Sequence, residues 1–198
     1  TLGHKIFQVP NAIDISSLPT NENRIYDKQV IFAGRLSKEK GIKTLIEICK
    51  NLPNDIHVII LGDGPEVEDI KKLESSQNNI HYFGSKNHQQ TISLIKGSDV
   101  LIQPSFSEGI STTILESMAC KTTVIASNVG GNLELIKNQE SGILIDPKNY
   151  EIFCEKIIEL MFDKSLRDKF STASYENVKK YDWKNIGEQY LELYSSLL

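Results

Sequence analysis

The sequence predicts an α/β fold in which helices cover both faces of a six-stranded, parallel, doubly wound sheet. From residue 29 onward, short apolar runs alternate with segments suited to helices. Some runs, such as residues 58–61 and 100–102, are apolar at every position, as expected for strands buried on both faces. The six predicted strands are residues 29–33, 57–61, 80–83, 100–103, 123–126 and 143–145.

Helices are expected between these strands and after the last one. The predicted helices are residues 42–52, 67–73, 91–96, 114–120, a segment starting near 149, 165–179 and 183–198. The final helix has an apolar face made of Ile186, Tyr190, Leu193, Tyr194 and Leu197. Because no further strand follows, this face packs either on its own domain or on a domain outside this chain.

We expect residues 1–198 to form a single domain with three parts. An opening segment and polar loop span residues 1–27, the core sheet spans 28–146, and the C-terminal helices span 147–198. The chain starts at Thr1 and enters a short apolar segment at once, which is typical of an excerpt or a processed piece.

Composition excludes several classes of protein. The 198 residues carry 26 acidic and 22 basic side chains, a net charge of −4, so a broad basic surface for nucleic acid is not expected. No apolar run approaches the ~20 residues that span a bilayer, and no leader peptide is recognised. Three widely spaced cysteines predict reduced thiols and a cytoplasmic location, and neither they nor His4, His57, His81 and His88 have metal-ligand spacing.

Ligands of open parallel sheets bind beyond the carboxyl ends of the strands, where helices begin. The loop after the first strand holds Arg35, Lys38 and Lys40, which suit two linked phosphates, although a solvated charged loop is the alternative. The loop after the second strand holds Gly62 and Gly64, which permit a tight turn near a ligand. A dinucleotide fingerprint would need a third glycine, so NAD is disfavoured. Residues 129–131, by themselves, indicate only a turn.

Two glutamates flank the predicted helix start at Ser111 or Thr112. Glu108 follows the fourth strand, and Glu116 lies in a helix that is apolar or small on nearly every face. A buried carboxylate costs several kcal/mol without partners, and vicinal hydroxyls of a sugar or ribose would serve. The alternatives for Glu116 are an exposed helix edge or an internal basic partner. Gly109, beside Glu108, removes a side chain where a ligand would approach.

Taken together, these motifs resemble the C-terminal, donor-binding half of the retaining GT-B glycosyltransferases of family 4, whose halves have a Rossmann-like fold. The resemblance covers nearly the whole chain through VPNAID (9–14), FAGRLSKEKG (32–41), LGDGP (61–65), YFG (82–84), SDV (98–100), PS (104–105), EG (108–109), LESMA (115–119) and VGG (129–131). Glu108 and Glu116 are similar to the family's E-x7-E pair.

The resemblance implies a role for each site residue. Arg35 and Lys40 would hold the diphosphate of a UDP-, GDP- or ADP-sugar, Glu108 the transferred sugar, and Glu116 the ribose. The donor site would also include the backbone and glycine positions Gly62, Gly64, Gly109, Ile110, Ser111, Thr112 and Thr113, with Ser85 and Lys86 near the base. Transfer would proceed without a metal, because cationic side chains and a helix N-terminus stabilise the leaving diphosphate.

The resemblance also implies a partner. The donor and acceptor would meet in a cleft between this domain and an N-terminal domain, so the isolated chain would be inactive. The acceptor would be a glycan or lipid-linked glycan, with the protein cytoplasmic or peripheral at the inner membrane face. A GT-B-type epimerase or phosphorylase, and a non-catalytic nucleotide-sugar-binding module, are the alternatives.

This sequence departs from the family pattern at a few positions. Ile110-Ser111 replaces the usual Phe-Gly, Ala12 a glycine, and residues 121–123 a common Gly-Thr-Pro. The Ser111 side chain is expected near the donor sugar, where it would influence which sugar is accepted.

Overall fold

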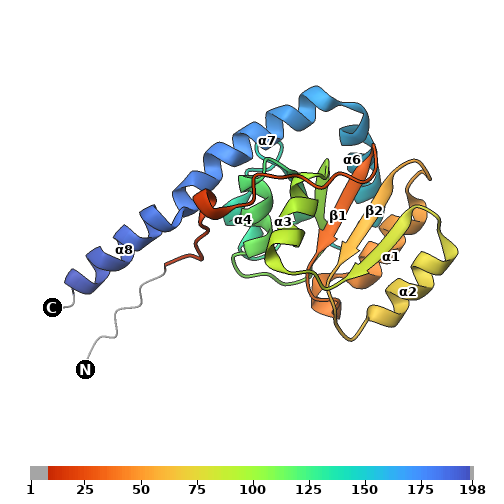
Figure 1. Ribbon diagram of the computed structural model, residues 1–198, viewed down its shortest axis with the longest axis horizontal. Helices are drawn as coiled ribbons and strands as arrows, with labels where there is room; N and C mark the ends of the chain where they lie inside the picture. Colours follow the sequence, from red (N-terminus) through yellow and green to blue (C-terminus); the bar gives the residue numbers. More distant parts are fainter. Residues whose placement is uncertain (1–8, 197–198) are drawn as a thin grey trace.

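The computed structural model describes residues 9–196, so His4 and Leu197 lie outside the described residues. The chain forms one six-stranded, all-parallel sheet in the order β3-β2-β1-β4-β5-β6 (Figure 1). The strands are β1 (Gln29–Ala33), β2 (His57–Leu61), β3 (Ile80–Gly84), β4 (Val100–Gln103), β5 (Thr123–Ser127) and β6 (Ile143–Ile145). The predicted doubly wound α/β fold is confirmed, and all six strands lie at or within one residue of the predicted bounds.

Helices cover both faces of the sheet, which explains the uninterrupted apolar strands. Val30 and Phe32 of β1 face one core, which is covered by α1 (Ile42–Asn51), α2 (Val67–Ser76) and α6 (Tyr150–Phe162). Ile31 and Ala33 face the other, which is covered by α3 (His88–Lys96), α4 (Thr112–Ala119) and α5 (Asn132–Leu135). Successive side chains of each strand therefore still point to opposite faces of the sheet, but both faces are apolar.

Two of the differences between the predicted and the observed helices have a clear local cause. The short helix α5 escaped detection because four residues carry too little periodicity to register. Helix α3 begins three residues earlier than predicted, because Asn87 and Gln90 form a reciprocal capping box at its start. His88 thereby becomes the first residue of this helix.

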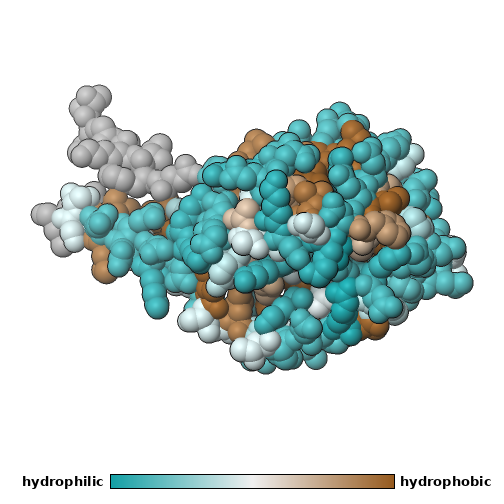
Figure 2. Space-filling view, turned by 90° about the horizontal axis from the view of Figure 1, so that it is seen from above, coloured by the Kyte–Doolittle hydropathy of each residue, from teal (hydrophilic) through white to brown (hydrophobic). Residues whose placement is uncertain are grey.

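The C-terminal helices differ in how they pack. Helix α7 (Lys164–Val178) contacts α4 and β5, whereas α8 (Trp183–Ser195) extends from the body as an arm (Figure 1). Of its predicted apolar face Ile186 is buried, Tyr190 and Leu193 are half-buried, and Tyr194 is exposed. Figure 2 shows brown surface along this arm, and Trp183, Leu191 and Tyr194 are its exposed large apolar side chains.

The opening segment is attached to the junction before α8. The Ile13 amide donates to the Tyr181 carbonyl at 2.9 Å, and the Trp183 amide donates to the Ile13 carbonyl at 2.9 Å. Cys49 and Cys154 are buried and Cys120 is half-buried, all as free thiols, as predicted. Within residues 9–196, no helix is both long and apolar enough to cross a bilayer.

Candidate functional site

The strand order places a crevice between β1 and β4. In a doubly wound sheet, the connections leave in opposite directions at this point, and ligands bind at the carboxyl ends of the two strands. The loops that follow β1 and β4 hold Arg35, Lys40 and Glu108. The fold therefore brings these predicted site residues to one edge of the sheet.

Gly41 lets the two loops approach closely. Its φ of 73° is left-handed, and a Cβ here would lie 1.9 Å from the Pro104 carbonyl oxygen. The Phe106 amide also donates to the Glu39 carbonyl at 2.7 Å. This contact sets Lys40 directly opposite Glu108.

The Glu108 carboxylate is enclosed by donors. Lys40 Nζ lies 2.7 Å from Oε1 and 2.9 Å from Oε2, and Ser105 Oγ donates to Oε1 at 2.7 Å. Gln103 Nε2 donates to the same Oε1. Only 6% of the Glu108 side chain is exposed. Lys40, expected on a diphosphate, is thus paired with Glu108 in this structure, and Gln103 and Ser105 are site residues that the sequence reasoning missed.

Ser111 contacts the same cluster through Gln103, and its expected place near the donor sugar stays a prediction. Ser111 is 6% exposed, and its hydroxyl exchanges hydrogen bonds with the Gln103 amide at 3.1 and 3.2 Å. It also accepts from the Ile114 amide at 3.4 Å, capping α4. The Ser111 hydroxyl and the Glu108 carboxylate therefore share the Gln103 amide nitrogen as a donor.

The glycines of the neighbouring loops have two different roles. A Cβ at Gly62 would lie 1.8 Å from the Gly34 carbonyl oxygen, and one at Gly64 would lie 2.4 Å from that of Leu36. These glycines therefore let the loops after β1 and β2 pack together. Gly109 differs, because a Cβ there would meet nothing within 4 Å. The space beside Glu108 is open.

The loop 129–131 supports the Glu108 loop, a role that its sequence alone did not reveal. A Cβ at Gly130 would lie 1.9 Å from the Glu108 carbonyl oxygen, and one at Gly131 would lie 2.3 Å from that of Gly109. The Gly131 amide donates to the Glu108 carbonyl at 3.2 Å. Only glycine permits this close backbone contact.

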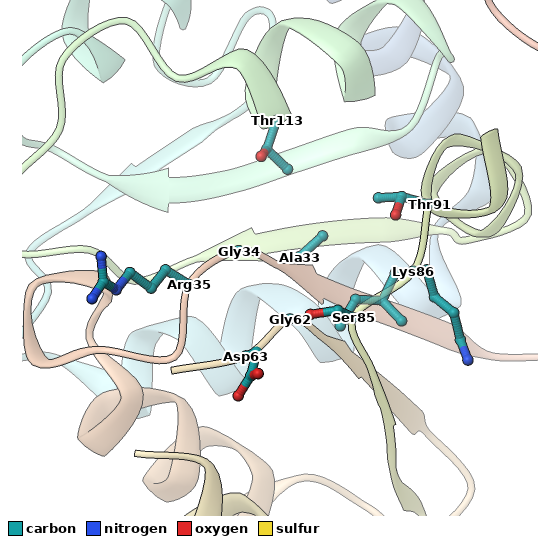
Figure 3. A pocket seen from close by; sticks show the side chains of 10 residues that line it. Ala33, Gly34, Arg35, Gly62, Asp63, Ser85, Lys86, Thr91 and Thr113 are labelled. Atoms are coloured by element: carbon teal, nitrogen blue, oxygen red, sulfur yellow. The ribbon is translucent and has the colours of Figure 1, made fainter. Parts of the chain in front are cut away.

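A cavity of about 350 Å³ lies along the same edge (Figure 3). Thr113 borders it on one side and Gly34, Gly62 and Ser85 border it on the other, with Arg35 and Lys86 toward opposite ends. Arg35 is solvent-exposed, and its guanidinium forms no hydrogen bond or ion pair with residues 9–196, although its carbonyl accepts from the Ser37 amide. The amides of Thr112 and Thr113, at the start of α4, likewise donate to no group in that range. Unlike Lys40, these donors are free to bind an anion.

Glu116 has a different environment. It lies in the middle of α4, and its Oε1 is 2.8 Å from Nε2 of His88, at the start of α3. Burial raises the pKa of the Glu116 carboxyl above its ordinary value, while the hydrogen bond and charge of His88 act in the opposite direction. Glu116 and His88 border a second cavity of about 180 Å³, together with Asp14, Ser17 and Thr112.

The sequence analysis gave no role to His88. The useful signal was local, because Asn87 and Gln90 form the N-x-x-Q pattern of a capping box. That pattern would have placed a helix start, and with it His88, at the same edge of the sheet as Glu116.

Comparison with known proteins assigns the family. The sequence profile of the glycosyl transferases group 1 family matches residues 19–177. The chain belongs to this family, and its Rossmann-like sheet is one half of the GT-B fold seen in its structural neighbours.

Three similar proteins illustrate the match. An N,N'-diacetylbacillosaminyl-diphospho-undecaprenol alpha-1,3-N-acetylgalactosaminyltransferase of Campylobacter jejuni is 27% identical over 85% of this chain and 45% of its own. The solved C-terminal domain of the group 1 family protein LpcC from Francisella tularensis is 27% identical, with a TM-score of 0.75 over 86% of this chain and 98% of its own. Anabaena HepE, solved with UDP-glucose, has a TM-score of 0.83 at 21% identity, over 95% of this chain and 57% of its own.

The chain is shorter than its curated relatives. It spans about half the length of the curated relatives that it matches, 45% in two of the most similar proteins.

Proposed function

We propose that this chain is the donor-binding domain of a retaining family 4 glycosyltransferase that uses a nucleoside-diphosphate sugar. One observation carries the proposal: Glu108, in the loop before α4, and Glu116, inside α4, each contact a basic partner at the sheet's switch point. Free donors and a cavity lie beside them.

The diphosphate would bind at the N-terminus of α4. Two features support this position: the Arg35 guanidinium, which has no partner among residues 9–196, and the Thr112 and Thr113 amides. Ile110 and Gly109 would contribute backbone and space, respectively. The base would lie toward Ser85 and Lys86, at the other end of the cavity.

Glu108 would act by electrostatic support and not as the nucleophile. Its Oε1 accepts three hydrogen bonds, and an ammonium group contacts both of its oxygens. Such a carboxylate is a weak nucleophile, because its negative charge is already stabilised. It is well placed to bind sugar hydroxyls or to balance positive charge at the anomeric carbon as the bond to the diphosphate breaks.

Lys40 would move its charge during the reaction. In this structure its ammonium contacts Glu108, and α4 begins four residues beyond that glutamate. As negative charge develops on the leaving diphosphate, Lys40 and Arg35 would stabilise it without a metal. Glu116 would accept hydrogen bonds from the ribose hydroxyls.

The acceptor would be a glycan or lipid-linked glycan, bound between this domain and an N-terminal one. The named activity of the Campylobacter relative, which acts on a diphospho-undecaprenol glycan, supports this class of acceptor. The exposed apolar residues of α8 suit packing against the N-terminal domain. We therefore expect the isolated chain to bind donor but not to transfer it.

Calorimetric titration with UDP, GDP, ADP and their sugars tests the proposal. We expect one nucleotide series to bind selectively, and Arg35→Ala and Glu116→Ala each to weaken binding about tenfold or more. Lys43→Ala, which removes an exposed, unpaired charge from α1, is the charge-matched control and should bind like the parent. Binding that is indifferent to Arg35 and Glu116 would contradict the proposed site.

A further inference from the structure

His88 contacts Glu116 although none of the steps above uses it. It is the first residue of α3, where the Asn87 side chain accepts from the Gln90 amide at 2.9 Å and the Gln90 side chain accepts from the Asn87 amide at 3.3 Å. This reciprocal capping fixes the backbone at residues 87–90. The imidazole is therefore presented to Glu116 from a well-defined helix start.

The contact leaves half of the Glu116 carboxylate available. Oε1 is 2.8 Å from His88 Nε2, whereas Oε2 has no hydrogen-bond partner within residues 9–196. Oε2 is not one of the fully buried atoms, so solvent reaches it. One oxygen is thus held by the protein, and the other is free for a ligand.

We propose that His88 is a positioning residue that holds Glu116 in the orientation required by the ribose hydroxyls. The inference rests on the proposed function, because it takes Glu116 as the ribose acceptor. A glutamate has three rotatable side-chain torsions, and fixing them before the ligand arrives lowers the entropy lost on binding. The His88 hydrogen bond also favours the ionised form of Glu116, which is the form that accepts two hydroxyl hydrogen bonds.

A purely structural role does not account for the contact. The His88 side chain is 63% exposed, so it contributes little to the core. The imidazole forms no other side-chain hydrogen bond within the described chain. Its removal should therefore alter ligand affinity more than stability.

The test combines single and double variants with two ligands. Calorimetry uses whichever of UDP, GDP or ADP the parent chain binds most tightly, and the corresponding 2′,3′-dideoxy nucleotide. We expect His88→Ala to weaken binding of the ribonucleotide about fivefold to tenfold. His88→Gln, whose amide nitrogen can reach the position of Nε2, should restore the affinity to within about twofold.

Coupling to Glu116 separates positioning from a general effect. In a Glu116→Ala background, His88→Ala should cause no further loss, and its penalty should vanish for the dideoxy nucleotide. The neighbouring exposed Gln89, changed to Ala, is the matched control and should bind like the parent. Thermal unfolding of each variant confirms that it is folded.

The outcomes distinguish this inference from the function beneath it. Loss of affinity in Glu116→Ala with parent-like binding in His88→Ala would overturn the positioning role alone. An equal His88→Ala penalty with and without Glu116 would also overturn it. No binding of any nucleotide by the parent would overturn the proposed function and the inference together.

Discussion

Glu108, in the loop before α4, and Glu116, inside α4, differ in both burial and hydrogen-bond partners. Glu108 is 6% exposed and receives hydrogen bonds from Lys40, Gln103 and Ser105. Glu116 is 17% exposed, and His88 is its one side-chain hydrogen-bond partner within residues 9–196. A carboxylate whose hydrogen-bond donors all belong to the protein is suited to keep its charge through a reaction. A carboxylate with a free oxygen is suited to bind a ligand reversibly.

Neutralising Glu108 tests most directly whether the two glutamates have different roles. In the full-length enzyme, Glu108→Gln should lower the rate of sugar transfer by about 100-fold or more, because the charge opposite the anomeric carbon is lost. Nucleotide affinity should change little, since Gln can retain the hydrogen bonds to Lys40 and Ser105. Steady-state kinetics and calorimetry measure the two effects. A loss confined to donor affinity would make Glu108 a binding residue like Glu116.

A second test removes the cation from Glu108. Lys40→Ala leaves a mostly buried carboxylate without its counter-charge and should destabilise the domain by about 1–2 kcal/mol, less than a fully buried pair because Lys40 is itself partly exposed. Thermal unfolding should show a lower Tm. Adding Glu108→Gln should recover part of the loss, because the unpaired charge is then gone. Equal Tm values for the single and double variants would show that the ion pair is not coupled.

Glu116 should behave in the opposite way. Its pKa is raised in the folded state by burial, so the contribution of this group to stability is fully present below its unfolded pKa and is lost as pH rises through the folded pKa. At pH 7 the ionised Glu116 side chain therefore destabilises the folded state. Glu116→Gln should raise Tm by about 2–4 °C at pH 7, and by less near pH 4. A lower Tm at pH 7 would show that the His88 contact outweighs burial.

The smallest expected effect is on the pH dependence of binding. Ionised Glu116 is the form that accepts hydrogen bonds from hydroxyl groups. As pH is lowered, its raised pKa means that it is protonated earlier than an ordinary carboxylate, so nucleotide affinity should begin to fall at a higher pH. The titratable groups around Glu116 are His88 from α3, Asp14 from the opening segment, and Cys120 one turn further along α4. Glu116→Gln controls for these groups and for the diphosphate itself. Parallel pH profiles for parent and variant would contradict the assignment.

The sequence predicted the sheet because its strands carry a strong and repetitive signal. It also predicted which loops meet, because strand order places their carboxyl ends at one edge. Glu108 and Glu116 stood out as charges in an apolar neighbourhood. These inferences depend on local patterns and on topology, both of which a single sequence contains.

The contacts made by the site residues could not be predicted in the same way. The pairing of Lys40 with Glu108 depends on Gly41 allowing two loops to touch, and Ser111 contacts the Gln103 amide. In both contacts, side chains meet from segments that are not adjacent in the sequence. The role of Gly131 beneath Gly109 is likewise a backbone contact, for which a Gly-Gly turn gives no signal.

Amide chemical-shift mapping during titration with a nucleoside diphosphate would show where the nucleotide binds. We expect the changes to concentrate at the carboxyl edge of the sheet, at Gly34, Arg35, Lys86, Thr112 and Thr113. Residues at the opposite edge, where Tyr26, His57 and His81 stack, should be unaffected. Changes centred on that stack, or on the separate cavity bordered by Pro19, Lys121 and Tyr175, would contradict the proposed site.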